Sequence, residues 1–117
     1  MAVTSTQVKN SASVVQIAVG RYLSSDTAAA FTITTGFKPL YVKVINVTAA
    51  STGLNWVEWY HGMAAASAIK VDDQGTSEAG VTLITTLGIT QLSYGFTVGL
   101  DTDLNVISEQ LSWIAIG

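Results

Sequence analysis

The sequence predicts an all-β fold, either a single-domain β-sandwich or a small, jelly-roll-like barrel of about eight or nine short strands. Short stretches alternate apolar and polar residues, clusters of Gly, Asp and Ser separate these stretches, and no stretch has the length and period of a helix. At 117 residues the chain can bury one modest core. We therefore expect a polar N-terminal arm at residues 1–12 and one β domain at residues 13–117.

The stretch from residue 38 to residue 63 is expected to form the central pair of strands, joined by a turn of small residues at 49–53. Side chains alternate between the two sides of a strand. On the first strand, one side carries Val42 and Val44, and the other Tyr41, Lys43, Ile45 and Val47. On the second strand, one side carries Val57 and Trp59, and the other Leu54, Trp56 and Tyr60. Because both sides are mostly apolar, the core should cover one side and something else the other.

Further strands are expected before and after this pair. Residues 13–23 are predicted to form a half-buried strand, because Val15, Ile17 and Val19 occupy alternate positions. The other expected strands are residues 31–35, 69–71, 81–83, 95–99, 104–106 and 111–116. Residues 88–95 are ambiguous, residues 63–68 could form a single helical turn, and residues 72–80 should form a loop.

The composition favours a protein that is buried against other subunits. Charged residues make up only 11% of the chain, against roughly 25% in ordinary soluble domains. The mean hydropathy is +0.44, so the surface of so small a domain must be partly apolar. The five basic residues are isolated from one another, so no nucleic-acid partner is expected.

The uncharged run from residue 79 to residue 100 is not expected to cross a membrane. Four glycines and many Thr and Ser residues interrupt it, which favours strands over a spanning helix. The N-terminal residues lack the basic start and apolar core of a secretion signal. The chain has no cysteine, so disulfides and cysteine-based metal sites are excluded.

His61 is the one histidine and the first candidate for catalysis. The nearest carboxylate in sequence is Glu58, but three positions along a strand place the two side chains on opposite sides. No serine lies in a GxSxG motif. We therefore expect His61 to be a partly buried structural residue at a strand end, and the protein to be no enzyme and to use no cofactor.

Asp101, Asp103 and Asn105 match the opening of a calcium-binding loop. The match then fails, because Val106 occupies the position that requires Gly and Ser112 the position that requires Glu. An Asx turn that caps backbone amides is the expected structure, and no metal site is predicted. The acidic residues of the 72–80 segment, Asp72, Asp73 and Glu78, are expected to lie in a solvated loop.

The tryptophans are the best candidates for contact with another protein. Trp56 and Trp59 are an odd number of residues apart on one strand, so if one fills the core the other points away from it. Either the chain itself covers both sides of the sheet, or the outward tryptophan anchors a contact between subunits. The candidate interface residues are Trp56, Trp59, Tyr60 and Tyr41.

Three stretches between residue 36 and the C-terminus resemble a known family. They are GFKPLYVKVINVT, WVEWYHGM and GITQLSYGFTVGLDTDLNVISEQLSWIAIG. This pattern is similar to that of the small structural proteins of tailed bacteriophages that decorate or cement the capsid. The resemblance implies a β-rich homo-oligomer, commonly a trimer, that binds the major capsid protein on the outer surface of an icosahedral head. The virion is then the expected location, and the polar arm could lie along a neighbouring subunit.

Two other functions remain open. A tail or neck component of a virion would share the composition and the tendency to form oligomers. A carbohydrate-binding β-sandwich would use exposed aromatic rings to stack on sugars.

Overall fold

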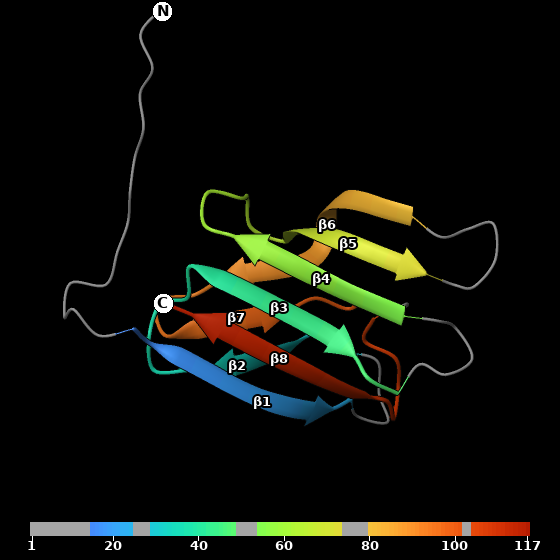
Figure 1. Ribbon diagram of the computed structural model, residues 1–117, viewed down its shortest axis with the longest axis horizontal. Coiled ribbons are helices and arrows are strands. Elements are labelled where there is room, and N and C mark those ends of the chain that lie inside the picture. The colour runs from blue at the N-terminus through green and yellow to red at the C-terminus, as the bar shows by residue number, and fades with distance from the viewer. Residues whose placement is uncertain (1–14, 25–28, 49–53, 74–79, 102–103) are drawn as a thin grey trace, which may run out of the picture.

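The computed structural model describes residues 15–24, 29–48, 54–73, 80–101 and 104–117. These residues form eight strands and no helix, as Figure 1 shows, so the all-β prediction is confirmed. The strands are β1 (Ile17–Leu23), β2 (Phe31–Thr34), β3 (Tyr41–Asn46), β4 (Leu54–Tyr60), β5 (Ser67–Asp73), β6 (Gly80–Gln91), β7 (Gly95–Val98) and β8 (Gln110–Ile116). The expected N-terminal arm and the turn at 49–53 lie outside the described residues.

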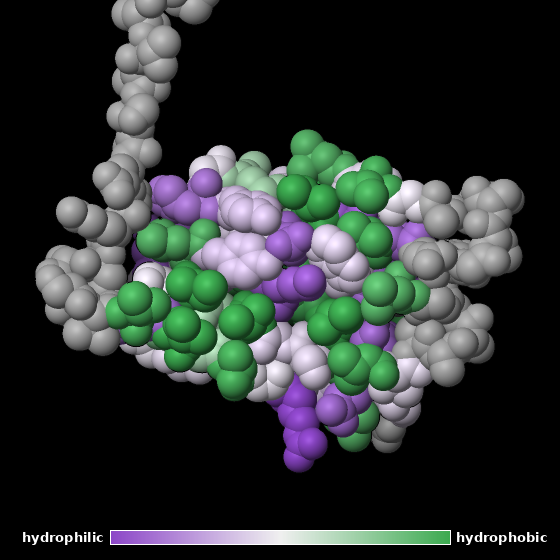
Figure 2. Space-filling view, in the orientation of Figure 1, coloured by the Kyte–Doolittle hydropathy of each residue, from purple (hydrophilic) through white to green (hydrophobic). Residues whose placement is uncertain are grey.

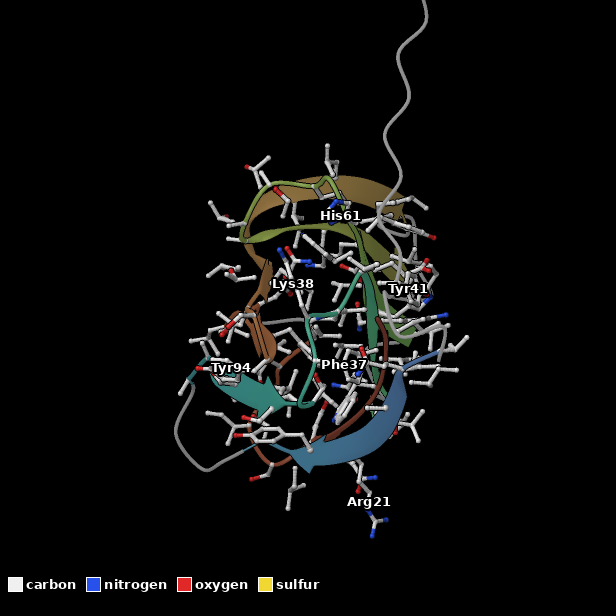
Figure 3. The ribbon with its side chains drawn as sticks, turned by 90° about the vertical axis from the view of Figure 1, so that its left-hand side faces the viewer. Arg21, Phe37, Lys38, Tyr41, His61 and Tyr94 are labelled. Carbon is white, nitrogen blue, oxygen red and sulfur yellow. The ribbon has the colours of Figure 1, made fainter. Side chains whose placement is uncertain are left out.

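All eight strands belong to one antiparallel sheet in the order β1-β8-β3-β4-β5-β6-β7-β2. The sheet curls into a half-barrel, with β7 and β2 facing β3, β8 and β1 across the interior (Figure 3). The strands at its two ends meet through side chains, because the ring of Tyr22 on β1 stacks on Phe31 of β2 with centroids 3.7 Å apart. The fold is therefore closer to the predicted small barrel than to two packed sheets.

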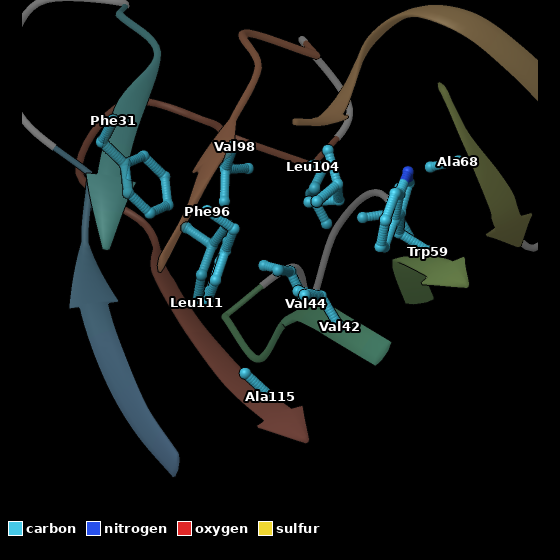
Figure 4. Packing of buried hydrophobic residues seen from close by; sticks show 12 residues of the cluster. Phe31, Val42, Val44, Trp59, Ala68, Phe96, Val98, Leu104, Leu111 and Ala115 are labelled. Carbon is cyan, nitrogen blue, oxygen red and sulfur yellow. The ribbon is translucent and has the colours of Figure 1, made fainter. Parts of the chain in front are cut away.

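The core fills the inside of this curl (Figure 4). Val42 and Val44 of β3 and Val57 and Trp59 of β4 point inward, as the alternation predicted. They pack in one cluster with side chains from the opposite wall, including Phe31, Phe96 and Val98. The central pair of strands thus covers the core with one side only.

A bulge in β6 produces part of the curl. Ser67 pairs with Ile89 whereas the next residue, Ala68, pairs with Ile84, so residues 85–88 are left out of the pairing. Before the bulge β6 pairs with β5, and after it β6 pairs with β7. A Cβ atom at Gly88 would lie 2.5 Å from the carbonyl oxygen of Ser67, so the close approach of the two backbones requires glycine there.

Several local predictions are wrong. The half-buried strand expected at residues 13–23 is present as β1, but Ile17 and Val19 lie on its exposed side, and Val19 is 70% exposed. Residues 104–106 form a turn, because the backbone amides of residues 104 and 105 donate to the carbonyl of Asp101. Residues 63–68 form no helical turn, since Ser67 and Ala68 already belong to β5. Asp72 also lies within β5, with a half-buried side chain.

Candidate functional site: the outer face of the sheet

The candidate site is the convex side of the sheet over β1, β8, β3, β4, β5 and β6. The pairing register places its side chains in three rows that cross the strands. The middle row is Val19, Ile114, Lys43, Glu58, Ile69 and Leu83. The flanking rows are Arg21, Ser112, Ile45, Trp56, Val71 and Val81 on one side, and Ile17, Ile116, Tyr41 and Tyr60 on the other. We call these 16 residues the outer face.

The outer face is predominantly apolar. All of its residues are aliphatic or aromatic except Lys43, Glu58, Arg21 and Ser112. Figure 2 shows this side of the molecule, with groups of hydrophobic side chains around a more polar centre. The hydrophobic side chains of β6 are well exposed, at 72% for Val81 and 64% for Leu83. Exposed apolar side chains gathered on one face in this way are typical of an interaction site.

The two central charges each have a partner within the face. The ammonium of Lys43 lies 4.3 Å from the centre of the Trp56 ring, a cation–π contact. The Glu58 carboxylate accepts hydrogen bonds from the hydroxyls of Tyr41 and Tyr60. The two tyrosine rings meet edge to face with centroids 5.2 Å apart. The centre of the face is therefore a preformed cluster of aromatic rings and paired charges.

The two tyrosines are held in their neutral form. Burial, and then the hydrogen bond to Glu58, raises the pKa of Tyr41 well above its ordinary value. The negative charge of Glu58 is the main cause that raises the pKa of Tyr60. Both hydroxyls therefore remain hydrogen-bond donors at any physiological pH.

Three of the four candidate interface residues come together on the outer face. Trp56 and Tyr41 are half-buried there, and Tyr60 is 47% exposed. Trp59, the fourth, points into the core and is only 2% exposed, so another subunit cannot reach it. Lys43 and Glu58 were not singled out from the sequence. Their direct pairing follows only from the register of β3 and β4.

The remaining polar cluster holds the fold together. The ammonium of Lys70 lies 3.0 Å from both carboxylate oxygens of Asp101, and Asp101 also accepts a hydrogen bond from the amide of Leu104. Asn105 accepts from the Ser24 hydroxyl and donates to the carbonyl of Ala29. Asp101 thus caps a turn, as expected, while Asp103 lies outside the described residues. Within the described ranges, no three His, Asp or Glu residues are grouped to hold a metal ion.

His61 is exposed in the turn after β4, so the prediction of a partly buried histidine is wrong. Its backbone amide donates to the carbonyl of Leu40. The Glu58 carboxylate is instead hydrogen-bonded to the two tyrosines of the outer face.

In the part of the chain that the structure describes, no helix is long and apolar enough to cross a membrane. No protein-family model, curated protein or solved structure matches this chain.

Proposed function

We propose that this protein is a structural protein of a tailed-phage virion with no enzymatic activity. It would act as a decoration, or cement, protein that binds the major capsid protein on the outside of the head as a homo-oligomer. The observation that supports this proposal is the outer face, an apolar surface on a domain whose core is already complete. Such a surface suits permanent assembly and needs no catalytic group.

The proposed action is mechanical. Packaged DNA pushes the shell outward, so neighbouring capsomers tend to separate. A protein that contacts two capsomers adds interface area that must be broken before they part. Shape complementarity and apolar contact, repeated at many identical sites, suffice for this task.

Some residues of the stretches that carry the family resemblance act in the fold. Gly62 of the WYHGM stretch adopts φ +101° in the turn after β4, a conformation that favours glycine. Asp101 and Asn105 of the GLDTDLN stretch hold the turn between β7 and β8. The same stretches also contain Tyr41, Trp56 and Tyr60 of the outer face, so the resemblance and the outer face support the assembly role together.

The test is electron microscopy of phage particles incubated with gold-labelled protein. Label at regular positions on the head is the expected result. Label confined to the tail or neck would favour the other virion role, and the absence of label on any particle would contradict the proposal.

A glycan-binding screen tests the carbohydrate-binding alternative. We expect no binding there, because the Lys43 ammonium already lies over the Trp56 ring that a sugar would stack on.

A further inference from the structure

We infer that the outer face binds a second copy of the same chain, around a two-fold axis that runs between β3 and β4, parallel to them. This inference rests on the proposed role of the outer face as an assembly surface. It adds the identity of the partner and the symmetry of the contact.

The size of the face fits a weak dimer interface. Because the sheet is curved, Arg21 of β1 points away from the side on which Tyr41 of β3 lies (Figure 3), so only β8, β3, β4 and β5 of two copies can meet. Four strands about 4.8 Å apart, crossed by three rows of side chains about 6.8 Å apart, cover roughly 400 Å². Two such faces bury about 800 Å² in total, which is below the range for stable interfaces. We therefore expect association that depends on concentration.

The charge pattern selects a second copy as the partner. Lys43 and Glu58 are direct cross-strand neighbours at the centre of the face. The proposed axis passes between them, so Lys43 of one copy lies over Glu58 of the other, and the reverse contact forms on the other side of the axis. A two-fold axis across the strands would instead place Lys43 on Lys43, which like-charge repulsion disfavours. The charges thus specify both self-recognition and the direction of the axis.

The apolar residues also match themselves under this rotation. Because the order of strands is β8-β3-β4-β5 at the centre of the face, the axis places β8 over β5 of the other copy, while β1 and β6 curve away on either side. The facing pairs are then Ile45 with Trp56, Tyr41 with Tyr60, and Ile114 with Ile69. Among these central strands, Ser112 would meet the apolar Val71, and Ile116 faces no residue of the outer face. A face that matches itself in this way is what a two-fold contact requires.

Charge reversal tests the inference. Lys43→Glu alone and Glu58→Lys alone each place like charges across the axis, so each variant should associate at least tenfold more weakly than the wild type. An equimolar mixture of the two variants places opposite charges across the axis again and should recover association. Sedimentation velocity over a wide range of concentrations measures all of these states, and circular dichroism checks that each variant is folded.

Two further variants keep the test decisive if charge reversal disturbs folding. Tyr60→Glu changes a residue that is 47% exposed, so the fold should tolerate it, yet it places a charge against Tyr41 of the other copy. Tyr94→Glu is the matched control, because Tyr94 is 52% exposed and lies on the opposite side of the molecule from Tyr41 (Figure 3). Tyr60→Glu should weaken association and Tyr94→Glu should not.

A wild type that is monomeric at all concentrations would overturn the inference. So would a trimer, the state that the family resemblance favours, if its mass does not respond to charge reversal. The result is independent of the electron microscopy of labelled phage particles. Recovery in the mixture without label on phage heads would refute the proposed function alone, whereas labelled heads with unchanged self-association would refute this inference alone.

Discussion

At the residue scale, the cluster of Tyr41, Glu58 and Tyr60 on the outer face makes the stability of the fold depend on pH. Both tyrosines have a pKa above the ordinary value of 10.0, so the folded protein retains their protons in a range where the unfolded chain loses them. The contribution of the cluster to stability is therefore complete below pH 10 and is lost as the pH rises above it. A salt-bridged carboxylate has the opposite pH dependence, because its contribution to stability is lost as the pH falls.

Tyr41→Phe should separate this effect from general alkaline unfolding. At pH 7 the variant should lose about 1–2 kcal/mol of unfolding free energy, since a hydrogen bond to a charged group is removed. Between pH 8 and about pH 11 the wild type should lose stability more steeply than the variant. Urea unfolding at these pH values measures the difference. Tyr94→Phe on the opposite side is the control, and parallel pH profiles for wild type and Tyr41→Phe would contradict the prediction.

The ion pair of Lys70 and Asp101 is the second feature whose removal has a defined cost. The side chains are only 14% and 9% exposed, and Asp101 also holds the amide of Leu104. Asp101→Ala should therefore lower the unfolding free energy by about 3 kcal/mol, because the mostly buried ammonium loses this carboxylate. Asp101→Asn keeps the oxygen that caps Leu104 and should cost less. Chemical unfolding checks both, and equal losses would show that the cap contributes nothing.

At the element scale, β1 and β8 fit together because of one glycine. Gly20 pairs with Trp113, and a Cβ atom added at Gly20 would lie 2.5 Å from Cζ2 of that indole. Trp113 in turn meets Phe96 of β7 edge to face. The absence of a side chain at Gly20 thus lets Trp113 bridge the two walls of the half-barrel.

Gly20→Ala should consequently destabilise the fold by about 1–3 kcal/mol, because the ring or the strand must shift. Gly80→Ala is the matched control, since nothing lies within 4 Å of the added Cβ atom there. Thermal unfolding followed by tryptophan fluorescence reports both stability and the surroundings of Trp113. Equal stability of the two variants would mean that the indole moves aside freely.

The strands could be predicted from the sequence more reliably than their orientation. Alternation located β1, but alternation does not specify which side is the inside. The more apolar side of β1 faces outward because Gly20 and Tyr22 are needed within, against Trp113 and Phe31. The bulge of β6 was also missed, since it depends on the close approach of Gly88 to Ser67, which no local pattern indicates.

The candidate site could be predicted in part. The shared side of Trp56 and Tyr60 on β4 followed from the period of two in that strand, whereas the place of Tyr41 on the same side required the register of β3 and β4. The contributions of β1, β5, β6 and β8 required the order of strands in the sheet, which brings residues from both ends of the chain onto one face. The partnership of Lys43 and Glu58 required the register, because a shift of one residue would place them on opposite faces.

At the scale of the whole molecule, a sheet that is apolar on both sides places Trp56 and Trp59 of one strand in two different surroundings. Trp59 faces the core and Trp56 the outer face. Trp59→Ala should lower the unfolding free energy by about 3–5 kcal/mol, because it opens a cavity among packed side chains.

Trp56→Ala should leave the unfolding free energy of the monomer within about 1 kcal/mol of the wild type, because the half-buried ring lies on the outer side of the sheet, beside the Lys43 ammonium, and not in the core. It should nevertheless weaken self-association by about 2 kcal/mol, roughly 30-fold, since the ring lies near the proposed axis against Ile45 of the second copy. Chemical unfolding at low concentration measures the first quantity and sedimentation the second. A loss of stability without a loss of association would reverse the assigned roles and leave the outer face without its anchor.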